Sequence, residues 1–79
     1  MTREEVYARL MDVFRDVFER EVELSDGITA ADVSGWDSLN HINLIGTIED
    51  EFEIKLPMKD VVSLKNVGDI VTRVIELKG

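Results

Sequence analysis

The chain has 79 residues, no cysteine, a single histidine and a formal net charge of −8 at pH 7. This length allows one small domain over residues 1–79, and the composition excludes disulfides, thiolate metal sites and His-rich metal sites. The negative charge argues against a nucleic-acid partner, because phosphate backbones attract Lys and Arg. The apolar runs are too short for a membrane span and the first residues lack a basic-then-apolar signal, so we expect a cytoplasmic protein.

The first predicted helix covers residues 3–20. Thr2 and Glu5 have the spacing of a capping box, in which each side chain bonds the backbone N–H of the other residue. The apolar residues that follow recur at the helical period and cover one broad arc: Val6, Tyr7, Leu10, Val13, Phe14, Val17 and Phe18. An arc of this width predicts a helix that packs against other helices.

Residues 22–36 are predicted to form a long connection, because they contain several turn-forming Ser, Asp and Gly residues. Leu24, Ile28 and Val33 are the expected tethers to the core, and Trp36 is expected to anchor the end of the loop. A loop of this length in a small domain is often functional, although it can also simply span the length of a bundle.

The second predicted helix begins at Asp37 or Ser38, both good N-cap residues, and ends near Phe52. Its core-facing arc holds Leu44, Ile45, Ile48 and Phe52. An adjacent arc is partly apolar but lies outside the core stripe, and it holds Ser38, Leu39, Ile42, Gly46 and Glu49. This second arc is a candidate for contact with other molecules.

Two further helices are predicted after Pro57, one short helix over residues 58–64 and a last helix that Asn66 and Asp69 cap. The last helix has a clean apolar stripe and ends near Leu77. We find no strand alternation and no internal repeat. The sequence therefore predicts an all-α fold, a small four-helix bundle of three longer helices and one short helix, with a long loop between helices one and two.

The acidic residues are concentrated in the middle of the chain. Residues 21–54 contain no Lys or Arg, and they hold nine acids: Glu21, Glu23, Asp26, Asp32, Asp37, Glu49, Asp50, Glu51 and Glu53. The rest of the chain is nearly balanced in charge. Two interpretations stay open, a solvated surface that aids solubility and a docking surface that attracts basic partners.

The segment Gly35-Trp36-Asp37-Ser38-Leu39 places a serine at the start of a helix, after a glycine-containing loop. Free backbone N–H groups and the positive end of the helix dipole would stabilise a phosphate ester on Ser38. Asp37 could help to hold a divalent cation with the phosphate oxygens. From these residues alone, a plain helix cap is the alternative, because Asp-Ser pairs begin many helices.

An ordered set of segments resembles the acyl carrier protein family over roughly residues 32–75. Asp37-Ser38-Leu39 opens a helix that ends Ile48-Glu49-Asp50-Glu51-Phe52, and it looks like the modification site of the family. Phe52-Glu53-Ile54-Lys55-Leu56-Pro57 is similar to the loop into the family's short third helix, and Val67-Gly68-Asp69-Ile70 to the start of its last helix. Trp36 and His41-Ile42-Asn43 look more like stand-alone carriers of specialised pathways.

The resemblance implies that a phosphopantetheinyl transferase attaches 4′-phosphopantetheine from coenzyme A to Ser38, with Asp37 supporting the attachment. The thiol of this arm would carry acyl groups as thioesters for enzymes of fatty-acid, lipid or polyketide-type biosynthesis, which agrees with the absence of Cys. The carrier itself would be a monomer without resident metal that catalyses nothing. Its partners would dock basic patches against the second helix, where the candidate docking residues are Leu39, Ile42, Glu49 and Asp50.

Two other functions are weighed against a carrier. The first is an acidic helical interaction module without a prosthetic group, in which Ser38 is a mere cap. The second is an enzyme, because Ser38, His41 and Asp37 invite comparison with a catalytic triad. Asp37 precedes Ser38, however, and no residue evident in the sequence would orient the imidazole. His41 is therefore predicted to be a partly buried polar residue, with contact to the pantetheine arm or the acyl path as a weaker option.

Overall fold

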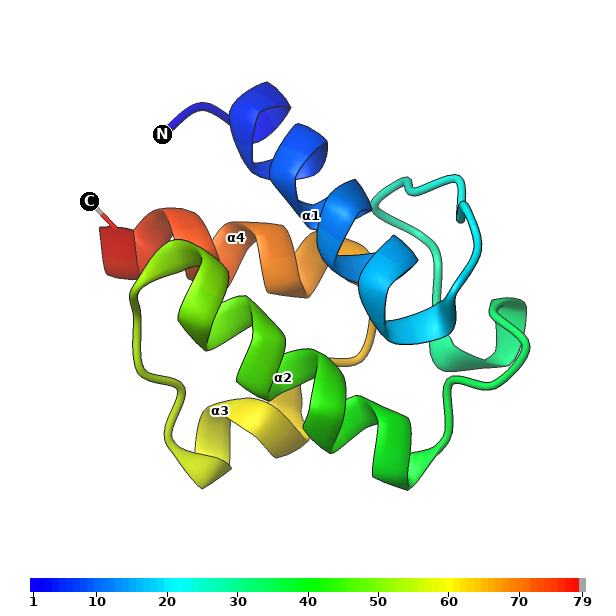
Figure 1. The fold of residues 1–79 in the computed structure, drawn as a ribbon. Helices are drawn as coiled ribbons and strands as arrows, with labels where there is room; N and C mark the ends of the chain where they lie inside the picture. Colours follow the sequence, from blue (N-terminus) through cyan, green and yellow to red (C-terminus); the bar gives the residue numbers. More distant parts are fainter. Residues whose placement is uncertain (79) are drawn as a thin grey trace.

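Four α-helices enclose one hydrophobic core in the computed structural model, which describes residues 1–78 (Figure 1). Three of them are long and one is short: α1 (Arg3–Phe18), α2 (Ser38–Phe52), α3 (Met58–Ser63) and α4 (Val67–Lys78). The predicted all-α four-helix bundle is therefore confirmed. Within the described residues, no helix has both the length and the apolar character needed to cross a membrane.

Two local arrangements set the ends of α1. The Thr2 hydroxyl accepts the Glu5 N–H at 3.1 Å, and the Thr2 N–H donates to the Glu5 carboxylate at 2.9 Å, which is the predicted capping box. At the other end Glu19 adopts a left-handed conformation, with φ of 58°, and its N–H donates to the Arg15 carbonyl at 2.8 Å. This C-cap ends the helix at Phe18, so the predicted boundary at residue 20 is two residues too long.

The core is built from the apolar arcs of α1, α2 and α4. All of the α2 residues predicted to face it are buried: Leu44, Ile45, Ile48 and Phe52. They pack with the buried residues of α1 and α4: Val6, Leu10, Val13, Phe14, Val67, Ile70, Val71 and Val74. In α3 the one buried residue is Val61, so apolar burial holds this short helix less firmly than the other three.

The long connection between α1 and α2 is fastened to the bundle along its length. All three predicted tethers pack against the core: Leu24, Ile28 and Val33. A short 3₁₀ turn over Ala30–Asp32, which was not predicted, lies within it. A polar contact also holds the connection and was not predicted. Asp26 accepts hydrogen bonds from the Tyr7 hydroxyl and from Arg3, the latter at 2.7 Å. The Tyr7 hydroxyl first, and Arg3 second, lower the pKa of the Asp26 carboxyl.

The same connection meets the start of α4. The N–H groups of Val67 and Gly68 donate to the backbone carbonyls of Ile28 and Asp26 at 2.8 and 3.0 Å. This approach is so close that a Cβ on Gly68 would lie 3.0 Å from both the Cβ and the carbonyl oxygen of Asp26. By contrast, a Cβ on Gly46 of α2 would meet no described atom within 4 Å.

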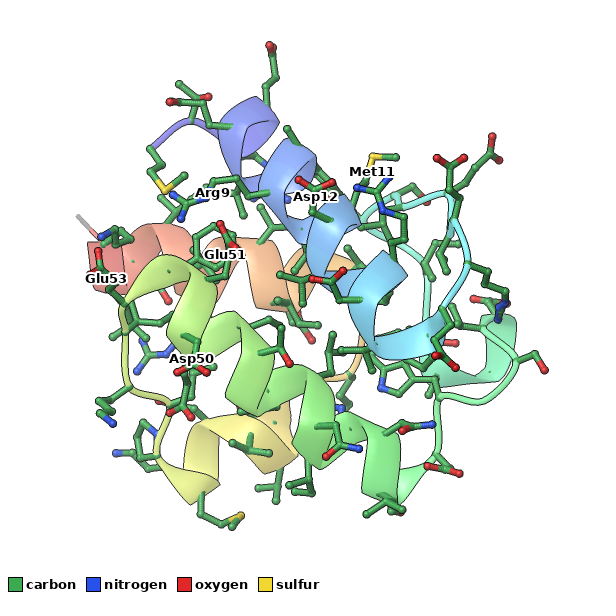
Figure 2. All side chains as sticks on the ribbon, in the orientation of Figure 1. Arg9, Met11, Asp12, Asp50, Glu51 and Glu53 are labelled. Carbon is green, nitrogen blue, oxygen red and sulfur yellow. The ribbon has the colours of Figure 1, made fainter. Side chains whose placement is uncertain are left out.

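Arg9 joins α1 to the C-terminal end of α2. Its Nε lies 2.7 Å from Glu51 Oε2, its guanidinium also donates to the Glu51 carbonyl, and its Cζ lies 4.8 Å from the centre of the Phe52 ring. Figure 2 shows Arg9 and Glu51 close together between the two helices. Because both side chains are partly exposed, the ion pair contributes at most about 1 kcal/mol. It nevertheless neutralises one acid of the acidic middle segment.

The two glycines provide a matched test of this packing. We expect Gly68→Ala to lower the free energy of unfolding by about 1–3 kcal/mol, because its Cβ crowds the Asp26 backbone. We expect Gly46→Ala to raise it by about 0.5–1 kcal/mol, because Ala is the better helix former and nothing opposes its Cβ. Urea unfolding followed by circular dichroism measures both. If the Gly68→Ala chain were as stable as the Gly46→Ala chain, the Asp26 backbone would have to move away from the new Cβ at little cost in free energy.

Candidate functional site

Ser38 is the first residue of α2, and its side chain is exposed. The helix cap is the preceding residue, Asp37, whose Oδ1 accepts the Asn40 N–H at 2.9 Å. The sequence left the cap open between Asp37 and Ser38, and the structure assigns it to Asp37. The hydroxyl of Ser38 makes no hydrogen bond with the described residues, so it is available for modification.

The turn before α2 is held in place by the first turn of the helix. Gly35 has φ of +89°, a conformation that glycine adopts without strain. Its carbonyl accepts hydrogen bonds from the Asp37 N–H at 3.0 Å and from Asn40 Nδ2 at 2.6 Å. Arg20, two residues after the end of α1, donates to the Ser34 carbonyl at 2.7 Å. The backbone on both sides of Ser38 is therefore fixed before any group is attached.

The start of α2 suits a phosphodiester on Ser38. The N–H groups of Ser38 and Leu39 make no hydrogen bond with the described residues, and they lie at the positive end of the helix dipole. Such N–H groups are suitable donors for phosphate oxygens. Among the described residues, no group of three or more His, Cys, Asp or Glu side chains is arranged to hold a metal ion.

A groove opens beside Ser38, between α2 and α3, with a volume of about 580 Å³. Trp36, His41 and Ile42 line it on the α2 side, and Met58, Val61 and Val62 line it on the α3 side. Ligand pockets have volumes of about 300–1,000 Å³ and mostly apolar walls, so both features suit an organic group. The groove begins at Asp37 and Ser38, where an attached arm would start.

Trp36 anchors the end of the long connection, as predicted. It is 7% exposed, and its ring packs edge-on against Phe14, with centroids 5.4 Å apart and planes at 85°. The centre of the Phe18 ring lies 6.3 Å from that of Trp36. Aromatic pairs of this geometry add about 0.5–1.5 kcal/mol beyond the area that they bury. The residue two positions before Ser38 is thus fixed to α1.

His41 is partly buried, as predicted, but the structure corrects the view that nothing orients its ring. The Trp36 indole N–H donates to His41 Nδ1 at 3.1 Å, and His41 Nε2 lies 3.2 Å from the Val61 carbonyl oxygen. Both ring nitrogens are therefore occupied, and neither bonds the Ser38 hydroxyl. This geometry does not provide the general base that a serine nucleophile requires.

The candidate docking residues fall into two groups. Leu39 and Ile42 are exposed, Ile42 to 54%, so Ile42 does not pack under the long connection. Asp50 is also exposed, and Figure 2 shows it apart from the pair of Arg9 and Glu51. Glu49 differs, because it is partly buried and its Oε2 accepts the Leu56 N–H at 2.7 Å.

Two exposed apolar residues of α3 were not predicted as part of the site. Met58 and Val62 are each 67% exposed, and both line the groove with Ile42. Their spacing of four positions in a predicted short helix was a usable signal, because such residues share a helix face. We use the name apolar patch for Leu39, Ile42, Met58 and Val62.

Comparisons with known proteins agree with this geometry. Residues 8–74 match the family described as phosphopantetheine attachment site. An acyl carrier protein of Brachyspira hyodysenteriae is 32% identical over 75 residues, which cover 87% of this chain and 96% of that protein. The meromycolate extension acyl carrier protein of Mycobacterium leprae is 29% identical over 79 residues, which cover 99% of this chain and 69% of that protein. The solution structure of holo acyl carrier protein from Geobacter metallireducens has a TM-score of 0.83 and 37% identity, and covers 89% of this chain and 82% of that one.

The family match spans most of the chain, so the chain belongs to the phosphopantetheine attachment site family. Its function is that of an acyl carrier protein, which carries acyl groups as thioesters on a covalently bound 4′-phosphopantetheine arm in fatty-acid or related biosynthesis. The resemblance found in the sequence is confirmed. The alternative of an acidic interaction module without a prosthetic group is set aside.

Asp37 combines a cap with a charge, and two substitutions separate these roles. We expect Asp37→Ala to lower the free energy of unfolding by about 1 kcal/mol, because the Asn40 N–H loses its acceptor. We expect Asp37→Asn to keep the cap and the stability but to lose the charge. Urea unfolding and the initial rate of phosphopantetheine loading are measured on both. Slower loading of both variants would support a role of the charge, whereas wild-type loading rates would make Asp37 purely structural.

Proposed function

We propose that Ser38 carries the phosphopantetheine arm. One observation supports this above the others: its exposed hydroxyl is unused, at a helix start whose backbone is fixed, beside a groove between α2 and α3. In the loading reaction the Ser38 hydroxyl displaces adenosine 3′,5′-bisphosphate from coenzyme A and forms a phosphodiester. The N–H groups of Ser38 and Leu39 are placed to donate to its oxygens. The arm supplies the thiol that the chain lacks.

The whole chain is proposed to act as a single carrier domain that catalyses no reaction itself. The occupied nitrogens of His41 support this, because they leave Ser38 without a base. A phosphopantetheinyl transferase and acyl-transferring or chain-modifying enzymes are the proposed partners. A monomeric state and a cytoplasmic location stay predictions.

Partner enzymes are proposed to dock on the apolar patch and on the acids near the end of α2. Three residues of the patch, Ile42, Met58 and Val62, line the groove, and exposed apolar residues next to charged ones are typical of transient interfaces. Asp50 and Glu53 are exposed and form no ion pair with the described residues, so they can attract a basic partner. Glu49 stays a candidate, but its bond to Leu56 gives it a structural role as well.

Loading of the intact chain tests the central proposal. After incubation with coenzyme A, magnesium and a broad-specificity transferase, we expect the mass to rise by one phosphopantetheine. The Ser38→Ala chain should show no gain. Ser34→Ala removes another exposed serine of the same turn, so it serves as the matched control and should load like the wild type. Modification that persists in Ser38→Ala would place the arm on another residue.

The docking surface is tested by acyl-transfer rates to a partner enzyme. We expect Ile42→Ala to lower the rate about fivefold to tenfold, as interface residues often do. We expect Asp50→Lys to slow transfer most at low salt, where charge attraction acts furthest. Melting temperatures should change little, because both side chains are exposed.

Two exposed residues of α1 provide controls for this test. Met11→Ala removes an exposed apolar side chain, and Asp16→Lys reverses an exposed acid, both on α1 rather than on α2 or α3. Transfer by these variants should equal that of the wild type. Equal losses in the control and test variants would indicate a general effect of charge or stability and would contradict a local docking surface.

A further inference from the structure

A hydrogen-bonded bridge links α2 to α3 beside the groove. It runs from the Trp36 indole N–H to His41 Nδ1 and from His41 Nε2 to the Val61 carbonyl, over 3.1 and 3.2 Å. An indole N–H can only donate, so Nδ1 accepts and the ring proton lies on Nε2, which donates to Val61. The bridge therefore requires one neutral tautomer of His41, which Trp36 selects.

The bridge lies at the boundary between the groove and the core. Trp36, His41 and Val61 line the groove, whereas the buried α2 residues Leu44 and Ile45 are not part of its lining. These two residues follow His41 by three and four positions, so they occupy the next turn of the same helix face. The imidazole and the backbone of Val61 consequently stand between the space next to Ser38 and the interior of the bundle.

We propose that His41 sets the depth to which an acyl chain can enter the carrier, by closing the inner end of the groove. This inference rests on the proposed loading of Ser38. The apolar walls from Ile42, Met58 and Val62 allow the first methylenes of a chain to lie along the groove. Deeper entry would separate His41 from Val61 and break the hydrogen bond between them, which is unfavourable. A chain of medium length is therefore held in the groove, within reach of partner enzymes.

A second tie holds α3 and provides a control. Arg73 of α4 lies 2.8 Å from the Asp60 carboxylate of α3, and the Asp60 side chain is only 14% exposed. Loss of this ion pair would loosen α3 while the bridge through His41 still closes the groove. Asp60→Asn thus separates a general loosening of α3 from the specific barrier at His41.

The test uses the chain loaded from octanoyl-coenzyme A, so that octanoyl-phosphopantetheine is attached to Ser38 in one step. Nuclear Overhauser contacts between a ¹³C-labelled octanoyl group and protein methyls locate the acyl chain, and hydroxylamine cleavage measures access to the thioester. In the wild type we expect contacts to Ile42 and Val62 but not to Leu44 or Ile48. In His41→Ala we expect contacts to Leu44 and Ile48. Cleavage should be about fivefold slower, because the deeper acyl chain draws the thioester away from solvent once the hydrogen bond between His41 and Val61 no longer opposes its entry.

Two further variants decide whether the bridge itself is responsible. His41→Gln can still accept from Trp36 and donate to Val61, so it should restore the wild-type contacts. Asp60→Asn should also keep them. Octanoyl contacts to Leu44 in the wild type, unchanged contacts in His41→Ala, or contacts to Leu44 in Asp60→Asn would each overturn the proposal.

The unloaded chain tests the bridge without any acyl group. The imidazole ¹⁵N spectrum should show the Nε2–H tautomer in the wild type and a mixture of tautomers in Trp36→Phe, which lacks the indole donor. An Nδ1–H tautomer in the wild type would overturn the bridge. A chain that no transferase can load overturns the proposed function, whereas a loaded chain with its octanoyl group in the core overturns this inference alone.

Discussion

The burial of Trp36 is the constraint on which the geometry of the carrier site depends. One side of the indole packs against Phe14 and Phe18, which fixes the end of the long connection to α1. The next residue, Asp37, caps α2, and Ser38 follows it. The position of the serine is therefore fixed as well. The indole N–H also selects the His41 tautomer that binds α3. A single buried side chain thus positions both the proposed attachment residue and the wall of the adjacent groove.

The acidic middle segment serves several purposes at once. Some of its acids are paired with arginines of α1: Glu21, Asp26 and Glu51. Others accept backbone N–H groups: Asp32, Asp37 and Glu49. Among the described residues, the acids outside both groups are Glu23, Asp50 and Glu53, and two of these lie at the end of α2. The acids without such a partner are therefore fewer than the nine of the segment, and most of them lie at the C-terminal end of α2, where they can attract a basic partner.

Local patterns account for the parts of the fold that could be predicted. The helical period predicted the buried face of α2, and the capping residues predicted the starts of α1 and α4, where Asn66 accepts the Asp69 N–H at 2.7 Å. The end of α1 was misplaced because Glu19 adopts a left-handed cap that its residue type does not signal. The tie between Asp26, Arg3 and Tyr7 was missed because nothing local relates these residues.

The sequence by itself determined the four helices and the place of Ser38 at a helix start, since each depends on residues within a few positions of one another. It also determined the family, through the order and spacing of several such segments. The tertiary structure decided what surrounds that serine. Trp36 and His41 are near neighbours in the sequence, but their roles depend on Phe14 and Val61, which other helices bring to them. Met58 and Val62, both exposed, likewise line a groove only because α3 lies next to α2. Helix periods and caps act within about one turn of the chain, whereas a groove and the hydrogen-bonded bridge beside it arise from packing between separate helices.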